Sequence, residues 1–272
     1  MNPNGPEPAK IRPAAVAGRF YPSHAVELRR LILSLLENCP PSGRPPPKAL
    51  IAPHAGYIYS GPVAASAYSL WQAARDATKR IVIAGPSHFV GFAGLAVSSA
   101  EAFETPLGFA AVDLEAVREA RSLPQVQVLD EAHELEHALE VQLPFLQVVL
   151  PEFKIVPLVV GSAGPDEVAE VLGLFWEDPQ TRFVVSSDLS HFLHSDDARA
   201  LDERTARAIE GLEPDRIAED QACGRMPIRG LLRAAAQRGL RGRIVDLRNS
   251  GDTAGSRHRV VGYGAFAFEE KL

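Results

Sequence analysis

Several side chains that could bind a metal ion follow short apolar runs in this sequence. His54 ends the run at 48–54, His88 ends the run at 80–88, and Asp188 and His191 close the run at 181–191. Ligands of open α/β sheets bind outside the carboxyl ends of the strands, so we expect these side chains to meet at one edge. Imidazole and carboxylate groups suit iron, copper, zinc or manganese, whereas too few carboxylates converge for a calcium site. A lone imidazole in a loop is more often structural, but several at one edge indicate a shared site.

Cys223 is a further candidate for this site. It lies shortly before Pro227, a residue that fits the first turn of a helix. The helix dipole and the nearby Arg225 would both favour the thiolate, which is the form that binds metal or acts as a nucleophile. The alternative is a small buried hydrophobic residue, which is the more common role of a single cysteine. Cys39 lies in a proline-rich loop, and we assign it no role.

Residues 133–137 match the H-E-x-x-H motif of zinc proteases, in which two histidines share one helix face. The segment opens a predicted helix that runs towards Val149, so the required spacing is available. Neither extended version of the motif is present, and so short a pattern arises by chance. We therefore favour coincidence over a metalloprotease. The nucleophile elbow, the phosphate-binding P-loop and a G-x-G-x-x-G loop after the first strand are absent.

The elements that must position these residues alternate between strands and helices. A helix is predicted from Ser23, followed by a proline-rich loop at 39–47 and by β-branched runs at 48–54, 80–88, 153–161 and 181–191. Helical segments follow these runs to about 77, at 165–176 and at 197–210. Such alternation predicts a largely parallel sheet covered on both faces. The segment 94–112 predicts a short strand and a hairpin, and 242–251 with 259–270 predict an antiparallel pair.

The fold class that we expect is therefore α/β, with a mixed, largely parallel sheet flanked by helices on both faces. No composition shift divides the chain, so residues 11–272 should form a single domain, and residues 1–10 should form a disordered tail. The chain has 28 Lys and Arg against 34 Asp and Glu, which argues against a nucleic-acid partner. With two cysteines, no secretion signal and no apolar run long enough for a membrane span, we expect a soluble cytoplasmic protein.

Seven separated motifs together resemble the Memo family, which includes the AmmeMemoRadiSam system protein B. The resemblance extends from about Arg12 to Phe268, nearly the whole chain. The motifs, in chain order, are APHAGYIYSG (52–61), GPSH (85–88), ETPLG (104–108), EHALEVQLPFLQ (136–147), SSDLSHF (186–192), ACGR (222–225) and VVGYGAFAF (260–268). The resemblance implies a fold similar to that of the class III extradiol dioxygenases, which are non-haem iron enzymes.

This resemblance also implies roles for particular residues. The metal ligands would be His54, His88 and Cys223, holding iron or copper. The cysteine replaces the carboxylate of the dioxygenases, so the site departs from the iron enzymes and becomes softer. His191 would act as the acid–base residue, oriented by Asp188.

Two further positions of the resemblance bear on the pocket. Glu136 and His137 match the family motif and would line the pocket. Gln142 stands where some family members have a second histidine, which weakens any ligand role at this position.

The function that we expect from these residues is a metal-binding, redox-active protein, with an oxidoreductase of unknown substrate as one form of it. One alternative is an extradiol-type non-haem iron dioxygenase. The other is a non-enzymatic module that binds a peptide or protein, as the resemblance implies for eukaryotic relatives. The resemblance further implies an AMMECR1-domain protein and a radical-SAM enzyme as partners.

Overall fold

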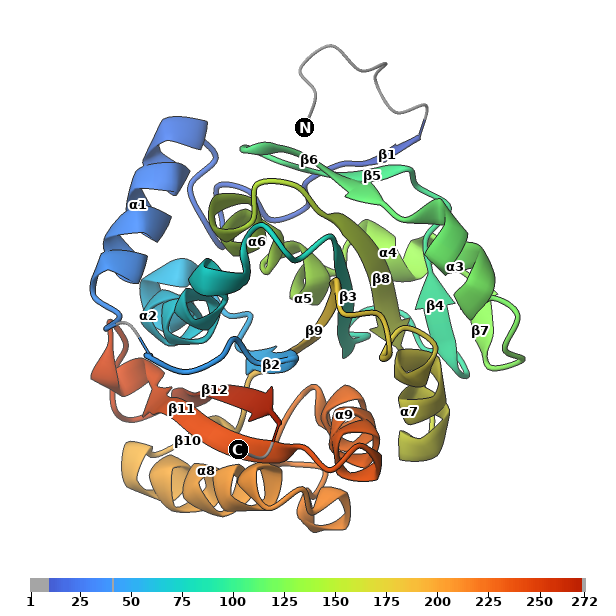
Figure 1. The fold of residues 1–272 in the computed structure, drawn as a ribbon. Coiled ribbons are helices and arrows are strands. Elements are labelled where there is room, and N and C mark those ends of the chain that lie inside the picture. The colour runs from blue at the N-terminus through green and yellow to red at the C-terminus, as the bar shows by residue number, and fades with distance from the viewer. Residues whose placement is uncertain (1–9, 41, 271–272) are drawn as a thin grey trace.

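The protein is an α/β fold built on one mixed sheet (Figure 1). The computed structural model describes residues 10–40 and 42–270, so the predicted tail, apart from Lys10, lies outside the described residues. The strands of this part of the chain are β1 (Ile11–Arg12), β2 (Ala49–Ala52), β3 (Arg80–Pro86), β4 (Leu95–Val97), β5 (Ala102–Thr105), β6 (Gly108–Val112), β7 (Val126–Val128), β8 (Lys154–Val160), β9 (Thr181–Ser186), β10 (His191–Leu193), β11 (Arg241–Asn249) and β12 (Val260–Glu269).

The centre of the sheet is parallel and its margins are mixed. The main order is β1-β5-β6-β8-β3-β9-β2-β12-β10, in which β8, β3, β9 and β2 run parallel and β12 is antiparallel to β2. The four parallel strands are almost wholly buried, because helices cover both faces and leave no solvated side to alternate with. The predicted runs at 48–54, 80–88, 153–161 and 181–191 each contain one of these strands, so the expected fold class is confirmed.

The two marginal features that the sequence indicated are also present. β11 pairs antiparallel with β12, as predicted for the C-terminal segment. β5 and β6 form the expected hairpin, with Thr105 opposite Gly108, and β4 is the short strand that precedes it. Gly108 adopts φ 108° at this turn, a conformation that a side chain would strain.

Helices cover both faces of this sheet. They are α1 (Ala25–Glu37), α2 (Tyr57–Tyr68), α3 (Leu114–Ala120), α4 (Glu131–Glu134), α5 (His137–Glu140), α6 (Leu143–Val149), α7 (Pro165–Gly173), α8 (Ser195–Glu210) and α9 (Arg225–Gln237), with short 3₁₀ segments at Ser69–Ala74, Pro214–Arg216 and Ser250–Asp252. Figure 1 shows α1, α2, α5 and α6 on one side of the curved sheet and α7, α8 and α9 on the other.

Two helix predictions need correction. The first helix was predicted from Ser23 as its N-cap, but it begins at Ala25 and its N-cap is His24, one residue later. The segment that the sequence predicted as one helix towards Val149 is divided into α4, α5 and α6. The break falls at Glu136, whose backbone is extended and whose side chain caps α5 by accepting from Ala138 N.

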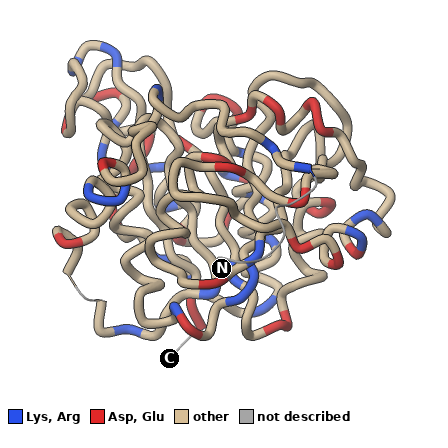
Figure 2. Tube along the Cα trace, turned by 90° about the horizontal axis from the view of Figure 1, so that it is seen from above, with Lys and Arg blue, Asp and Glu red and all other residues tan. Residues whose placement is uncertain are grey.

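Charged residues are spread over the whole molecule. Figure 2 shows basic and acidic positions interspersed in this view rather than separated by sign. Among the described residues, no helix has both the length and the apolar character needed to cross a membrane.

Candidate metal centre

Three neighbouring parallel strands deliver the predicted metal-site residues to one edge of the sheet. His54 follows β2, Asp188 follows β9 and His88 follows β3, and these strands lie side by side in the order β3-β9-β2. Cys223 comes from a later segment of the chain, directly before the N-cap of α9. One ligand atom from each of His54, His88 and Cys223 lies within 4.8 Å of the others. The expected meeting of two imidazoles and one sulfur is therefore present in the fold.

The ring of His54 is held in one tautomer by Ser186. The Ser186 hydroxyl donates its single hydrogen to the carbonyl of Ala138 at 2.6 Å, so towards His54 Nδ1, at 2.9 Å, it can only accept. Burial, followed by the neighbouring His88, lowers the pKa of His54 to about 3, so its imidazole is neutral. A neutral ring with its proton on Nδ1 presents the lone pair of Nε2. That atom faces Cys223 Sγ at 3.3 Å.

His88 is oriented in the same way by a buried carboxylate. Its Nδ1 lies 2.9 Å from Glu136 Oε1, and its backbone N donates to Glu136 Oε2 at 2.7 Å. Burial by itself raises the pKa of Glu136, but the hydrogen bonds and charge of His88, with the N–H of Ala138, lower it to about 2. An ionised carboxylate therefore fixes the proton on His88 Nδ1 and leaves Nε2 free. A carboxylate that holds the non-ligating nitrogen is the usual support of a metal-binding histidine.

Cys223 lies beside the two imidazoles, and its surroundings disfavour the thiolate. Burial, followed by the charge of Asp188, raises the pKa of its thiol to about 12. The expectation that the helix dipole and Arg225 would favour the thiolate is therefore wrong for the metal-free protein, because desolvation outweighs both. The sulfur receives an N–H from Asp188 at 3.3 Å. This donor would stabilise a thiolate once a cation displaces the proton.

His137 stacks against the site beside Glu136. Its ring lies 4.6 Å from that of His88 and 5.3 Å from that of His54, measured between centroids. Burial, followed by the repulsion that a protonated His137 would meet from a protonated His54, lowers the pKa of His137 to about 4. His88, Glu136 and His137 form a second group whose ligand atoms lie within 4.8 Å of one another. Glu136 and His137 thus lie beside His88, and the pocket-lining role that the family resemblance implied for them stays a prediction.

His191 and Asp188 both lie at this edge, but the hydrogen bond expected between them is not formed among the described residues. His191 Nδ1 donates to the carbonyl of Leu189 at 2.8 Å, which leaves its Nε2 free. Asp188 Oδ1 instead accepts the backbone N–H groups of His54 and Ala55. Phe192, directly after His191, has φ 63°, and the pairing of β10 with β12 shifts its register between His191 and Leu193. The predicted acid–base role of His191 is not tested by this geometry.

The H-E-x-x-H segment does not form the zinc site of a metalloprotease. His133 lies in α4 and His137 is the first residue of α5, so the two rings do not share one helix face. His133 is buried, its Nε2 faces the carbonyl of Ala96 at 3.1 Å, and its ring packs against Phe103. Chance occurrence, the favoured explanation of this motif, agrees with the structure.

Two residues behind the site had no predicted role. Gln142 donates to Ser186 Oγ at 2.8 Å and to the carbonyl of Pro53 at 3.0 Å, and it accepts from Tyr68. Gln142 therefore supports Ser186, which in turn supports His54, and it is not a ligand. The motif SSDLSH contained Ser186, but only the sheet register, which sets it beside β2, reveals its partner.

The surroundings of the site are partly aromatic. The rings of Phe20 and Phe89 lie 4.8 Å and 6.1 Å from that of His137, and the ring of Phe192 lies 5.6 Å from that of His191. We call Phe20, Phe89 and Phe192 the aromatic rim. Phe89 and Phe192 are 60% and 61% exposed, which is unusual for such side chains.

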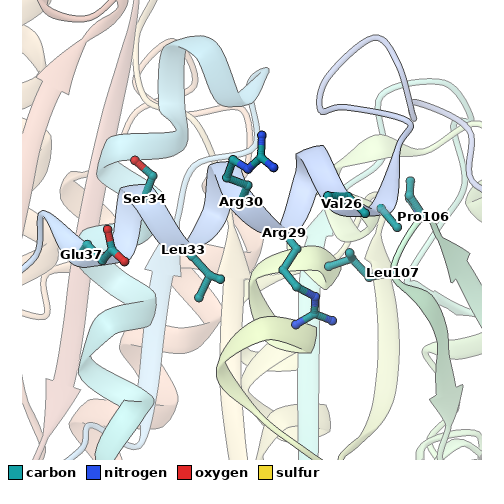
Figure 3. A pocket seen from close by; sticks show the side chains of 9 residues that line it. Val26, Arg29, Arg30, Leu33, Ser34, Glu37, Pro106 and Leu107 are labelled. Atoms are coloured by element: carbon teal, nitrogen blue, oxygen red, sulfur yellow. The ribbon is translucent and has the colours of Figure 1, made fainter.

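The surface cavities differ in how close they lie to the candidate metal ligands. A cavity of about 380 Å³ reaches Cys223 and is also lined by Ser87 and Arg225. A hollow of about 530 Å³ runs along α1, and Figure 3 shows Leu33, Arg29 and Leu107 on its walls. None of the candidate metal ligands lines the hollow along α1, so we place the functional site at the strand ends.

Comparison with known proteins gives one consistent result. Residues 12–267 match the protein family described as Memo-like protein. A MEMO1 family protein of Aquifex aeolicus is 36% identical over 271 residues, covering 95% of this chain and 99% of the relative. MEMO1 family proteins of Sulfolobus acidocaldarius and Archaeoglobus fulgidus are 36% and 35% identical, each with 95% of this chain and 99% of the relative covered.

Proposed function

Because this chain belongs to the Memo family, we propose that it binds one redox-active transition metal ion, iron or copper, through His54, His88 and Cys223. The observation that carries the proposal is the fixed tautomer of both imidazoles. Ser186 and Glu136 hold the Nδ1 atoms, so the Nε2 lone pairs remain available beside a sulfur atom. Two imidazoles with available Nε2 atoms and one thiol at the same edge of the sheet form a donor set that suits a transition metal.

The donor set also favours particular metals. Thiolate and imidazole ligands suit copper and iron, whereas magnesium and calcium prefer oxygen ligands, which these three residues do not supply. A bound iron or copper ion would supply one-electron chemistry with oxygen or with a bound substrate. Of these ligands, Cys223 would contribute one negative charge on binding, whereas the buried imidazole of His54 would contribute none.

The remaining residues of the chain would serve substrate binding and proton transfer. Nε2 of His191 is free to hold a proton or to accept one, because Leu189 fixes only Nδ1. Asp188 keeps the turn after β2 in place through the N–H groups of His54 and Ala55. The aromatic rim would exclude water and favour a substrate with an apolar or aromatic part. We further propose that the protein works as an oxidoreductase in the cytoplasm.

The test is metal content measured without reference to activity. The protein is purified from unsupplemented cells, reconstituted under anaerobic conditions with Fe²⁺ or Cu⁺, desalted and analysed for iron, copper and zinc. About one equivalent of iron or copper is expected in the wild type, and a loss of roughly tenfold or more in affinity is expected for Cys223→Ser and His54→Ala. Cys39→Ser is the matched control, because Cys39 lies in the loop after α1, outside the ligand group.

Two outcomes would overturn the proposal. Equal metal content in the wild type, Cys223→Ser and His54→Ala would show that these residues are not ligands. Stable binding of zinc alone, with no retention of iron or copper, would leave a metal site without the redox chemistry proposed for it.

A second candidate function is binding of a peptide or protein, and the aromatic rim favours it. Phe89 and Phe192 expose large apolar surfaces beside polar imidazoles, a combination found at interaction sites. A partner that is bound equally well by the wild type and by Cys223→Ser, but not by a Phe89→Ala Phe192→Ala double variant, would support this function. An extradiol dioxygenase would instead consume oxygen with a catechol and Fe²⁺, and would lose this activity in His191→Ala.

A further inference from the structure

A second cavity lies at the opposite end of the parallel strands. It has a volume of about 710 Å³ and is bordered by Lys48, which precedes β2, and by Arg182, the second residue of β9. His54 and Asp188 follow the same two strands at the other end. Arg238, which is the C-cap of α9, borders the cavity as well, whereas Cys223 precedes the start of this helix. The cavity is therefore separate from the candidate metal centre.

Lys48 and Arg182 are neighbours on adjacent parallel strands. Ala49 is in register with Phe183, and the N–H of Phe183 donates to the carbonyl of Lys48 at 3.1 Å. Two like charges in directly neighbouring positions of a sheet repel each other. Both side chains are half-buried, so water screens this repulsion less than it would on an open surface. A half-buried cation pair of this kind needs a compensating anion.

The described part of the chain supplies no such anion to these two residues. Within the described part of the chain, Lys48 Nζ donates only to the carbonyl of Asp178, at 2.7 Å, and neither Lys48 nor Arg182 forms an ion pair. Arg182 donates from Nε to Thr78 Oγ1 at 2.8 Å and from Nη1 to the carbonyl of Pro47 at 2.6 Å. Two N–H groups of the Lys48 ammonium and both of Arg182 Nη2 are thus left without a described acceptor.

The carboxylates around the cavity have other partners. Glu269 is paired with Arg44 at 3.3 Å and with Arg241 at 3.1 Å. Glu177 is paired with Arg238 at 3.5 Å.

The nearby Asp178 is paired with Arg80 at 2.8 Å, and Glu270 borders the cavity from an exposed position. Among the described residues that border the cavity, and apart from the exposed Glu270, the charge that has no ion-pair partner is therefore positive.

We propose that this cavity binds the phosphate group of a small molecule between Lys48 and Arg182. The unused N–H groups of the two side chains can each reach a different oxygen of one tetrahedral dianion, and a phosphate bound there would replace their mutual repulsion by attraction. The cavity is much larger than a phosphate ion, so it has room for the organic part of a phosphate ester. The wall formed by Trp176, with Arg238 4.8 Å above its ring, would contact that part.

The first test is a calorimetric titration of the full-length protein with inorganic phosphate and, separately, with glycerol 3-phosphate. Saturable binding is expected for the wild type. Lys48→Met should weaken it by about tenfold or more, which is the usual effect of losing one charge-assisted hydrogen bond. Lys48→Arg should retain binding within about threefold, because the charge remains.

Lys154→Met is the matched control. Lys154 begins β8 at the same edge of the sheet, is exposed and does not line the cavity, so its loss removes an equal charge without touching the site. The affinity of Lys154→Met for both phosphate probes should stay within about twofold of that of the wild type. Lys48→Met should also melt at a higher temperature than the wild type in phosphate-free buffer, since it relieves the repulsion, and this shows that the variant folds.

Each result decides the proposal. Absence of saturable binding to either probe, or equal weakening by Lys48→Met and Lys154→Met, would overturn it. Tighter binding of glycerol 3-phosphate supports an organic phosphate as the ligand, and equal binding supports free phosphate. Cys223→Ser should bind both probes as the wild type does, so the outcome is independent of the metal centre.

A pH titration with sulfate, whose charge is constant from about pH 7 to 9, examines Lys48 itself. Burial, followed by the charge of Arg182, lowers the pKa of Lys48 to about 8, with Arg238 acting in the same sense and Asp178 and Glu177 opposing it. Lys48 is charged below this pH, so sulfate binding by the wild type should weaken as the pH rises through about 8. Lys48→Arg should show no such loss. A wild-type affinity that does not change over this range would refute the role of Lys48.

Discussion

Ser186→Ala should weaken metal binding although Ser186 is not a ligand. In the wild type, the serine hydroxyl accepts the Nδ1–H of His54 and so keeps the Nε2 lone pair directed at Cys223. Alanine leaves this N–H without an acceptor in a fully buried position. The proton can avoid the loss by moving to Nε2, but Nε2 is the atom that the metal needs. Metal binding must then restore the unfavourable tautomer.

The size of the effect follows from the cost of an unsatisfied buried donor. That cost is about 1–3 kcal/mol, so a central value of about 2 kcal/mol corresponds to a roughly thirtyfold weaker affinity. Losses of about 10- to 100-fold are usual when the partner of a metal-binding histidine is removed. The free energy of unfolding of the metal-free protein should fall by about 1–2 kcal/mol, because Gln142 and the carbonyl of Ala138 also lose a partner.

The assay is a competition titration with Co²⁺, whose absorption reports thiolate ligation, together with urea unfolding of the metal-free protein. Ser60→Ala is the matched control, because its buried hydroxyl donates only to the carbonyl of Ala55 and does not contact His54. It should lower stability while leaving the Co²⁺ affinity within about twofold of the wild type. An unchanged Co²⁺ affinity in Ser186→Ala, or an equal loss in Ser60→Ala, would refute the tautomer argument.

Three further variants test the frame of the site. Gly224→Ala would place a Cβ 2.6 Å from that of Ser187, so it should cost about 1–3 kcal/mol and lower Co²⁺ affinity by displacing the neighbouring cysteine; wild-type affinity would contradict this. Glu140→Gln breaks the buried ion pair with Arg12 and should lower the free energy of unfolding by about 3–5 kcal/mol in urea, and a loss below about 1 kcal/mol would contradict it. Burial raises the pKa of Asp202 to about 6, so the wild type should lose about 3 kcal/mol as the pH rises from about 4 to 6. Asp202→Asn should remove this loss. If the wild type and Asp202→Asn differed in stability by the same amount at pH 4 and at pH 7, the argument would be contradicted.

The central sheet was predictable because its sequence signal is simple. Strands buried on both faces need unbroken apolar runs, and β2, β3, β8 and β9 all show them. The helix predicted towards Val149 was wrong in its continuity, although its composition is helical. Glu136 leaves the helical conformation there because its carboxylate accepts hydrogen bonds from His88, which lies 48 residues earlier in the chain. A contact between such distant residues cannot be inferred from local periodicity.

For the site, too, the sequence pattern predicted which residues come together, but not the features that depend on contacts with distant segments. The rule that ligands gather at the carboxyl ends of strands was enough to bring together His54, His88 and Asp188, because it needs only the strand positions. The state of Cys223 could not be predicted, since its thiol pKa depends on burial by segments that the sequence does not reveal. The orientation of His191 by Asp188 stays a prediction: no hydrogen bond joins the two among the described residues, and His191 Nδ1 donates to the carbonyl of Leu189.

The hydrogen bonds behind the ligands explain why this edge suits a metal better than acid–base catalysis alone. Nδ1 of His54 is bonded to the hydroxyl of Ser186, which is fixed by its hydrogen bond to the carbonyl of Ala138. Nδ1 of His88 is bonded to the carboxylate of Glu136, which is fixed because it caps α5. Two rings that are neutral, or held by an ionised carboxylate, and that cannot turn make poor proton shuttles, but they lose little entropy when they bind a cation. His191 differs, because its Nε2 has no partner among the described residues. Any proton transfer at this centre should therefore depend on His191, whereas cation binding should not.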